Sequence, residues 1–415
     1  MSNDTRPEIR FPGFTEDWEE RKLGDISDVT KLAGFEFTKY VTYSDEGEVI
    51  ALRGLNVKNG NLVLDEVKYI DGSDFSKLNR SRLYKNDILF TYVGTVGELA
   101  VVPEDDKYYL APNVARIRMN EGANPLFVSK LMNDKTFYNK IILPLIATSS
   151  QPALSMENVR KFTLMMPEIE EQEKIAVFLG SLDNLIFLHQ RKLDLLKETK
   201  KGFLQKMFPK NGAKVPEIRF PGFTEDWEER KLGELGKTQS GIGFPDAEQG
   251  GSEGIPFFKV SDMNNIGNEY EMRNANHYVS NEQIERKKWK PIKDVPAIIF
   301  AKVGAAIMLN RKRLVTSPFL IDNNTMAYLF NNTWDIYFGK ILFETINLPR
   351  YSQVGALPSY NSSDIENISV KVPVKDEQQK IGTFFKQLDD TIALHQRKLD
   401  LLKETKKSFL QKMFV

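Results

Sequence analysis

Residues 188–208 read LHQRKLDLLKETKKGFLQKMF, and residues 394–414 repeat this stretch with Ser408 in place of Gly202. Around both copies the apolar residues recur at alternating steps of four and three. This spacing predicts a long coiled-coil helix with one apolar seam. The predicted seam positions of the two helices are Ile175, Leu179, Leu182, Ile186, His189, Leu193 and Leu196, and Ile381, Phe385, Leu388, Ile392, His395, Leu399 and Leu402.

Polar residues interrupt each seam twice, at His189 and Lys200 in the first helix and at His395 and Lys406 in the second. Because the two helices are equivalent, we expect them to pack on each other antiparallel, about a pseudo-two-fold axis. Polar residues at seam positions fix register and orientation at some cost in stability, and we expect that role here. At a rise of about 1.5 Å per residue, one seam spans about 50 Å.

A second tract, which we call the leading tract, is duplicated without any change. Residues 7–24 read PEIRFPGFTEDWEERKLG, and residues 216–233 repeat them letter for letter. The end of this tract, DWEERKLG, predicts a short helix anchored by Trp18 and Leu23. The chain therefore contains two copies of one unit of roughly 206 to 209 residues. A constant frame carries two sequence blocks that differ.

Composition sets the broad class of the protein. A chain of 415 residues with 41% apolar and 27% charged residues is typical of two to four globular domains. The absence of cysteine excludes disulfides and thiolate metal sites. The start lacks the apolar core of a signal peptide, and no apolar run approaches membrane-spanning length, so we expect a soluble, cytoplasmic protein.

The formal net charge is zero. A protein that binds nucleic acid by itself is usually basic, because neutralised phosphates supply most non-specific affinity. Any DNA binding by this chain would therefore need local basic loops or partner subunits.

The two variable blocks share a texture of short β-rich runs separated by turn residues. DILFTYVG at 87–94 and AIIFAKVG at 297–304 stand at corresponding places, and residues 125–139 show helical spacing. This pattern predicts an α+β protein. We expect two mixed α/β domains, each with a twisted or barrel-like antiparallel sheet, separated by the two antiparallel coiled-coil helices of a pseudo-two-fold repeat.

Domain boundaries follow from the repeats and from the prolines that precede the helices. We predict a first variable domain at 1–166, a first long helix at 167–208, a linker at 209–215, a second variable domain at 216–372 and a second long helix at 373–415.

Signatures of catalysis are few. Two of the three histidines lie in the seams, which argues against a histidine-based metal site or triad. There is no phosphate-binding GxxxxGK[ST] loop, no cofactor-binding glycine motif and no Asn-Pro-Pro or Asp-Pro-Pro step. Asp246, Glu285 and Lys287 meet a loose Mg²⁺-nuclease pattern that a chain rich in Glu and Lys meets by chance. We predict no enzyme activity, no metal and no bound cofactor.

Recognition remains as a function. Basic and amide side chains gather in loops of both variable blocks, and such side chains contact phosphates and base edges. For any single one of these residues, an ordinary solvated surface loop is the more common explanation. The candidate DNA-binding residues are Arg53, Asn56, Arg80, Arg82, Lys85, Ser150 and Gln151 in the first block, and Lys259, Asp262, Asn264, Arg286, Lys287, Lys288, Lys290, Arg311, Arg313 and Gln353 in the second.

The frame resembles the specificity subunit of type I restriction–modification systems. The resemblance is carried by the repeated WEERKLG, by the pair DILFTYVG and AIIFAKVG, by Pro167 and Pro373 with the Glu-Gln-x-Lys-Ile that follows each, and by the LHQRKLDLLKETKK helices. It covers essentially the whole chain, in the same order in each half. One departure is AIIFAKVGAAI, which lacks the second glycine of DILFTYVGTVG, so no base contacts are carried over from the family.

The resemblance implies a subunit with two target-recognition domains that each read one half of a bipartite double-stranded DNA target. It also implies two methylation subunits that use S-adenosylmethionine on adenine, and restriction subunits that use ATP and Mg²⁺ for translocation and cleavage. This chain would perform none of that chemistry. The repeated tracts would dock the two methylation subunits, and the coiled coil would set the spacer between the half-sites.

An alternative also explains the duplicated frame: a coiled-coil scaffold that joins two protein partners without contacting DNA. It does not account for the basic, amide-rich loops. A gel shift with methylation subunits, with and without this chain, distinguishes the two hypotheses.

Overall fold

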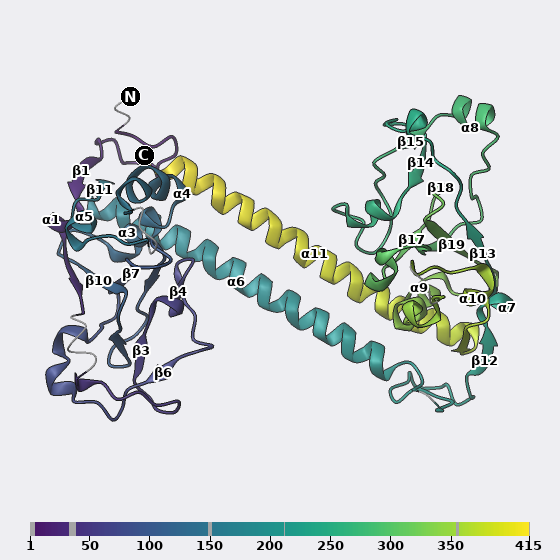
Figure 1. The fold of residues 1–415 in the computed structure, drawn as a ribbon, viewed down its shortest axis with the longest axis horizontal. Coiled ribbons are helices and arrows are strands. Elements are labelled where there is room, and N and C mark those ends of the chain that lie inside the picture. Colours follow the sequence, from purple (N-terminus) through teal and green to yellow (C-terminus); the bar gives the residue numbers. More distant parts are fainter. Residues whose placement is uncertain (1–4, 33–38, 148–151, 211, 354–356, 415) are drawn as a thin grey trace. The chain divides into compact units, whose positions relative to one another are not determined.

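The computed structural model describes residues 5–32, 39–147, 152–210, 212–353 and 357–414 (Figure 1). The chain forms two compact units. Unit 1 comprises residues 1–189 and 398–415, and unit 2 comprises residues 190–397.

Unit 1 carries two main sheets. Its elements in chain order are β1 (Glu19–Lys22), α1 (Leu23–Ile26), β2 (Ser27–Lys31), β3 (Ile50–Leu52), the 3₁₀ turn η1 (Gly54–Asn56), β4 (Val57–Lys58), β5 (Asn61–Leu62), β6 (Lys68–Tyr69), β7 (Ile88–Thr91), β8 (Leu99–Val101), β9 (Tyr108–Leu110), β10 (Val114–Met119), α3 (Pro125–Met132), α4 (Lys135–Phe137), α5 (Met156–Arg160), β11 (Thr163–Met166) and the first part of α6 (Ile169–Lys206). A four-stranded antiparallel sheet has the order β2-β10-β7-β8. A second sheet has the order β6-β3-β9, with β3 and β9 parallel.

Unit 2 repeats this plan. Its elements are β12 (Glu228–Lys231), α7 (Leu232–Leu235), β13 (Gly236–Ser240), β14 (Ile255–Phe258), the 3₁₀ turn η7 (Val260–Asn264), β15 (Tyr278–Val279), α8 (Asn281–Lys287), β16 (Ala297–Ala301), β17 (Lys312–Val315), β18 (Leu320–Ile321), β19 (Thr325–Phe330), α9 (Ile336–Thr345), α10 (Ser362–Glu366), β20 (Ser369–Val372) and α11 (Lys375–Met413), whose last part belongs to unit 1. The sheet orders are β13-β19-β16-β17 and β15-β14-β18, with β14 and β18 parallel.

The leading tract forms a strand at Glu19–Lys22, where the sequence predicts a short helix. Glu19–Lys22 pairs antiparallel with Thr163–Met166, directly before the long helix. The helix begins only at Leu23, and it has four residues. Glu228–Lys231 pairs with Ser369–Val372 in the same way. The tract takes an extended form because its partner strand lies at the far end of the variable block, which local spacing does not reveal.

The start of α6 is anchored by the Glu-Gln pair that follows Pro167. Glu171 is 1% exposed and accepts two hydrogen bonds from Arg10 of the leading tract, at 2.6 and 2.9 Å. The Gln172 side-chain Nε2 donates to the Pro167 carbonyl at 2.8 Å, and its Oε1 accepts from the backbone N–H of Asn124 at 2.8 Å. The pair therefore joins the leading tract, the long helix and the variable block.

Unit 2 repeats these bonds. Glu377, which is fully buried, accepts from Arg219 at 2.7 and 2.8 Å. The Gln378 amide donates to the Pro373 carbonyl at 3.0 Å and accepts from the Asp335 amide nitrogen at 2.9 Å. Arg–carboxylate pairs of this two-bond geometry are among the stronger polar contacts in proteins.

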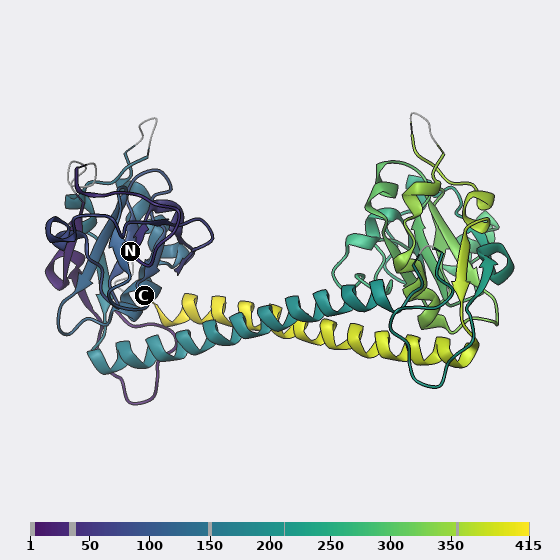
Figure 2. The ribbon, with the colours of Figure 1, turned by 90° about the horizontal axis from the view of Figure 1, so that it is seen from below.

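The two long helices run in opposite directions where they meet in each unit (Figure 2). In unit 1 the ring of Phe178 packs edge-on against Phe409, with centroids 4.8 Å apart. In unit 2 the equivalent pair, Phe384 and Phe203, has centroids 4.9 Å apart. The seam residues are all buried or half-buried, and apolar side chains outside the seam, such as Leu195 and Leu401, are exposed.

The seam lysines form ion pairs with aspartates of the other long helix. In unit 1 Asp183 of α6 pairs with Lys406 of α11 at 2.5 Å, and with Lys130 of α3. Burial alone would raise the pKa of Asp183, but the two lysines outweigh it and hold the pKa below its usual value. Asp183 therefore joins the two long helices to each other and also attaches α3 of the variable block to them.

Unit 2 contains the equivalent triad of one aspartate and two lysines, and there it is more deeply buried. Asp389 of α11 pairs with Lys340 of α9 at 2.5 Å and with Lys200 of α6 at 2.8 Å. Glu344 joins at 2.6 Å from Lys200, and the Tyr337 hydroxyl donates to Asp389 at 2.8 Å. Burial again opposes ionisation of Asp389, and the two lysines again hold its pKa below the usual value.

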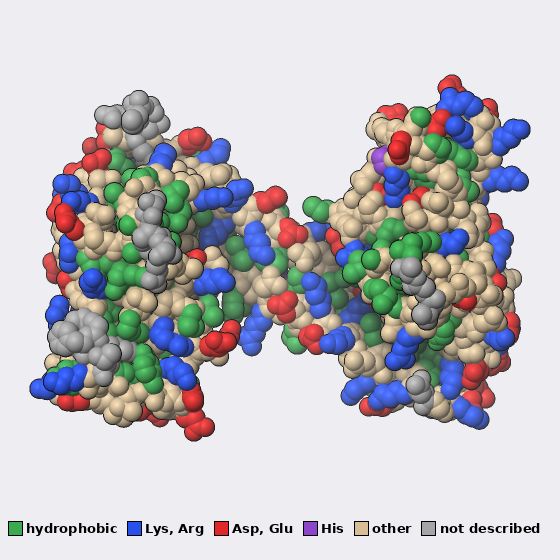
Figure 3. Space-filling model, in the orientation of Figure 1, with side chains coloured by type: hydrophobic (Ala, Val, Ile, Leu, Met, Phe, Trp, Pro, Cys, Tyr) green, Lys and Arg blue, Asp and Glu red, His purple; other side chains and the backbone are tan. Residues whose placement is uncertain are grey.

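Charges of both signs are interspersed over the visible surface of each unit (Figure 3), as expected for a chain of zero net charge.

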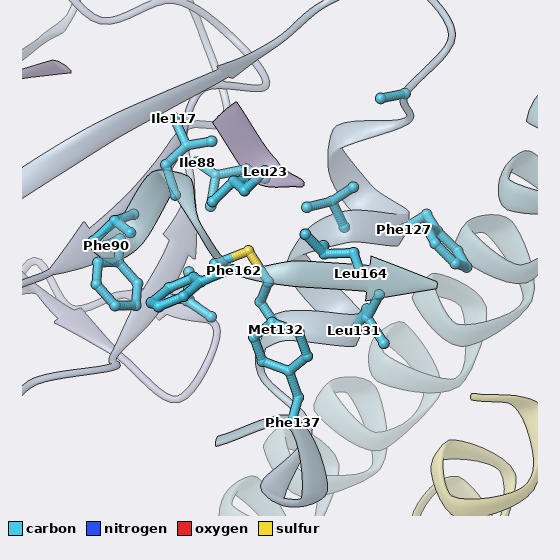
Figure 4. Close-up of a cluster of buried hydrophobic side chains, with 14 of the residues drawn as sticks. Leu23, Ile88, Phe90, Ile117, Phe127, Leu131, Met132, Phe137, Phe162 and Leu164 are labelled. Carbon is cyan, nitrogen blue, oxygen red and sulfur yellow. The ribbon is translucent and has the colours of Figure 1, made fainter. Parts of the chain in front are cut away.

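The core of unit 1 is built from the sheet, α3 and the frame together. Phe162 stands between Phe90 and Phe137, with ring centroids 5.8 and 6.2 Å away, and all three lie among the aliphatic side chains drawn in Figure 4. Trp18 of the leading tract is 2% exposed and packs on Phe127 of α3 at 5.8 Å. The variable block thus folds directly onto frame residues.

Candidate nucleic-acid interface

Three chain segments meet where strands of unit 1 end. β3 and β9 are parallel, so the residues that follow them lie at the same edge, the position at which ligands bind in parallel sheets. The Ala111 amide donates to the Leu52 carbonyl at 3.1 Å, and the Tyr92 amide, after β7, donates to the Asn113 carbonyl at 3.2 Å. These bonds hold the three segments side by side. We call them the reading edge of unit 1.

A groove of about 640 Å³ opens at this edge. Its lining residues come from all three segments and from the neighbouring Tyr43; they are Tyr43, Arg53, Gly54, Leu55, Val57, Lys58, Val93, Gly94, Thr95, Glu98, Pro112 and Asn113. Tyr43 and Leu55 expose about half of their surface, at 45% and 51%.

Asn56 fixes the turn after β3. The side chain is completely buried, and its carbonyl oxygen accepts from the Arg53 amide at 3.1 Å. Its amide group donates to the carbonyls of Val63 and Glu66 at 2.9 and 3.0 Å. Burial and these contacts leave Asn56 no access to DNA in this structure, so it acts as the anchor of the turn.

Arg53 is the residue that this turn presents to the groove. Its Nη2 donates to the Glu66 carbonyl at 2.9 Å, and its buried Nε has no hydrogen-bond partner among the described residues. A guanidinium has five N–H donors in a fixed plane, so the contact with Glu66 orients the group and leaves donors for a ligand.

Unit 2 builds the same edge. The Asp322 amide, after β18, donates to the Phe258 carbonyl at 3.1 Å, and the Lys302 amide, after β16, donates to the Asn324 carbonyl at 2.7 Å. These are the counterparts of the two bonds in unit 1. The segments after β14, β16 and β18 form the reading edge of unit 2.

The turn after β14 is also anchored by a buried acceptor. Asp262 is 0% exposed and accepts from the Lys259 amide at 2.7 Å and from the Asn276 amide at 3.3 Å. Burial raises the pKa of Asp262, although the two backbone donors oppose this. Lys259 occupies the place of Arg53, and its Nζ donates to Gln249 at 2.6 Å. Asp262, like Asn56, is an anchor.

Another group of predicted contacts lies at α8. Figure 3 shows Lys and Arg side chains gathered around this helix. Arg286 and Lys287 both pair with the buried Glu248, at 2.6 and 3.1 Å. Lys288 and Lys290 are exposed. The first two cations are exposed as well, and their pairing with Glu248 stabilises the domain locally.

The remaining predicted residues are scattered. Arg82 pairs with Asp106, and Arg311 donates to Asn264. Gln353 donates to Asp364 at 3.1 Å. Arg80 and Lys85 are exposed, and Ser150 and Gln151 lie outside the described residues.

Arg313 lies on β17, the outer strand of its sheet. It is half-buried, and burial lowers the pKa of its guanidinium. The adjacent Lys312 donates to the Ile346 carbonyl at 2.6 Å, and burial lowers its pKa to about 8.

Sequence reasoning missed several residues of the groove, among them Tyr43, Leu55, Thr95 and Asn113. Asn113 adopts a left-handed conformation, φ 71°, between β9 and β10. A polar residue that tolerates this conformation between two apolar runs is a signal of a tight turn. Nothing in the local sequence shows that this turn lies beside Arg53.

Within the described ranges, no three His, Cys, Asp or Glu side chains stand close enough together to hold a metal ion. Among the same residues, no helix is sufficiently long and apolar to cross a membrane.

Comparison with known families decides the identity of this architecture. The profile of the type I restriction modification DNA specificity domain matches residues 15–198 and again residues 224–404. The chain belongs to this family. It is a DNA specificity subunit of a type I restriction–modification system, with two target-recognition domains, and such subunits are non-catalytic. Membership in a family described by DNA specificity sets aside the scaffold without DNA contact.

Two curated relatives match over nearly the whole length of the chain. A putative type I restriction enzyme MjaX specificity subunit of Methanocaldococcus jannaschii is 24% identical, across 95% of this chain and 92% of the relative. The MjaVIII specificity subunit of the same organism is also 24% identical, across 97% and 92%.

Solved structures share the fold. The specificity subunit from M. genitalium superposes with a TM-score of 0.67 at 15% identity, covering 99% of each chain. A chain from a study of complex assembly in the type I system superposes at 0.52, with 18% identity over 98% and 99%. The predicted α+β fold, with two target-recognition domains and two long packed helices, is confirmed.

Proposed function

We propose that each target-recognition domain of this subunit reads one half of a bipartite DNA sequence. The observation that carries the proposal is the combination of one repeated fold with two different reading edges. Residues 1–166 would read the first half-site and residues 216–372 the second. Both domains attach to the frame through the same bonds, so their sequences are free to differ where DNA is contacted.

The repeated tracts would dock two copies of one methylation subunit. Identical surfaces favour identical partners, and each long helix exposes apolar side chains at equivalent places: Leu188 and Leu394 at 59% and 51%, and Leu195 and Leu401 at 60% and 63%. Exposure of the same apolar residues in both copies suits a surface that binds the same partner twice. A groove of about 740 Å³ between the second leading tract and α11 adds to it.

Partner subunits would supply the chemistry and much of the affinity. S-adenosylmethionine would bind the methylation subunits, and ATP and Mg²⁺ the restriction subunits, in the cytoplasm. A neutral specificity subunit suits this arrangement, because larger partners can provide the positive charge that grips the phosphates.

Exchange of residues 25–166 for the corresponding block of another specificity subunit tests the assignment. We expect the methylated sequence to change in one half only, because the second reading edge and the frame are untouched. Single-molecule sequencing of methylated adenines in a host that carries the whole system measures this. A change in both halves would contradict the proposal, and exchange of residues 234–372 is the matched control.

A further inference from the structure

We infer that the reading edge is the base-contacting surface of each target-recognition domain, and that Arg53 reads a guanine in the first half-site. The inference rests on the proposed function and names a residue that determines specificity. Arg53 stands at the carboxyl ends of the parallel strands β3 and β9, in a groove formed by three segments that backbone hydrogen bonds hold together.

The position of Arg53 is fixed before any ligand arrives. Its backbone is held by the buried Asn56, and its guanidinium is oriented by the Glu66 carbonyl at 2.9 Å. A group held in this way loses little conformational entropy on binding. The planar fork of N–H donors matches the O6 and N7 acceptors of guanine in the major groove, the commonest specific contact that arginine makes.

The surroundings favour a base over a phosphate. The groove is lined mainly by uncharged residues, such as Leu55, Thr95 and Asn113, and Glu98 is the carboxylate among its lining residues. At Gly94 no atom lies within 4 Å of where a Cβ would stand, so the backbone there is open to close approach. Lys58, an exposed cation of the same groove, is the better placed phosphate contact.

Unit 2 shows which feature varies between the domains. In both units a 3₁₀ turn follows a cation, and a buried side-chain acceptor, Asn56 or Asp262, anchors the turn. The presented cation is Arg53 in one domain and Lys259 in the other. Two domains that read different half-sites need the same anchored turn and different presented side chains. The reading edges of the two units meet both requirements.

The test uses the full chain assembled with its methylation subunits. Initial rates of methyl transfer are measured on duplexes in which each base pair of the first half-site is replaced in turn. For Arg53→Ala we expect discrimination to fall by roughly 5- to 150-fold at one guanine position, with the other positions and the second half-site unchanged. Arg53→Lys keeps the charge but loses the fork, so it should show the same positional loss.

The control is Lys77→Ala, an exposed lysine of the same domain that does not line the groove. Melting curves of each variant report folding, and Arg53→Lys carries the test if the alanine variant fails to fold. Loss of methylation that is equal on every duplex, or unchanged discrimination at all positions, would overturn the role of Arg53 while the proposed function stands. If the wild-type complex methylates no two-part sequence, the proposed function itself fails.

Discussion

At the scale of single residues, the same polar side chain can serve the fold or the ligand, and only its surroundings decide which. Asn56 and Asp262 have the chemistry that suits base edges, yet both are fully buried and bonded to backbone groups. The presented residues are their neighbours Arg53 and Lys259. The sequence predicts that both turns take part in recognition, and it cannot separate the buried anchor from the presented residue because both are polar.

Asn56→Ala is expected to destabilise unit 1 by about 2 to 4 kcal/mol, because it leaves the Val63 carbonyl and the Arg53 amide without this partner and removes one of the two hydrogen bonds to the Glu66 carbonyl. Amide hydrogen exchange in β3, measured over a series of denaturant concentrations, reports this loss of stability. Asn79→Ala, at an exposed position of the same unit, serves as control and should stay within about 0.5 kcal/mol of wild type. Equal stability of both variants would contradict the anchoring role.

At the scale of secondary-structure elements, regular spacing was informative and pairing between distant segments was not. The heptad pattern gave the long helices and identified Lys200 and Lys406 as unusual seam residues. Their partners Asp389 and Asp183 lie on the other helix. These two ion pairs are the contacts through which the seam lysines would fix the register of the helices, as we expect from the sequence. The strand Glu19–Lys22 was missed because its partner is more than a hundred residues away.

Replacing the aspartate of each triad by asparagine should lower the free energy of unfolding by different amounts in the two units. Asp389→Asn should destabilise unit 2 by about 3 kcal/mol, because the aspartate side chain is 3% exposed and the two buried lysines are left with Glu344 as their remaining carboxylate. Asp183→Asn is the matched control: its side chain is 31% exposed, so we expect about 1 kcal/mol. Hydrogen exchange in α9 and in α3 reports the two units separately.

The dependence of the free energy of unfolding on pH, measured at acidic pH, tests the role of Asp389 in the triad of unit 2. The folded-state pKa of Asp389 lies below its usual value, so its contribution is present above the unfolded pKa of about 3.9 and is lost as pH falls through the lower folded pKa. The gap in stability between wild type and Asp389→Asn should therefore close below about pH 4. A gap that persists at lower pH would show that the carboxylate charge is not the stabilising feature.

At the scale of the whole molecule, duplication itself was the strongest signal in the sequence. Two identical tracts and two unlike blocks predicted a repeated fold with two target-recognition domains, and the family comparison agrees. The parallel strand pairs at the reading edges could not be predicted. The runs at Ile50–Leu52 and Tyr108–Leu110 are three residues long, far apart in the chain and without a helical crossover between them.

The proposed spacer role of the helices gives the last prediction. Insertion of one heptad after Gln190 and another after Gln396 keeps the seam in register, because the apolar repeat has a period of seven. Each helix lengthens by about 10 Å, and base pairs rise by about 3.4 Å. The methylated target should therefore gain a spacer about three base pairs longer, with both half-sites unchanged. Methylome sequencing measures the spacer directly.

Four-residue insertions at the same two places are the control for this experiment. They lengthen the helices by about 6 Å but rotate the seam, so Leu193 and Leu399, both 1% exposed, would leave their packed positions. We expect the four-residue variants to lose stability and methylation together. If the heptad variant methylates efficiently with the original spacer, helix length does not set the gap, and the spacing must come from how the partner subunits hold the DNA.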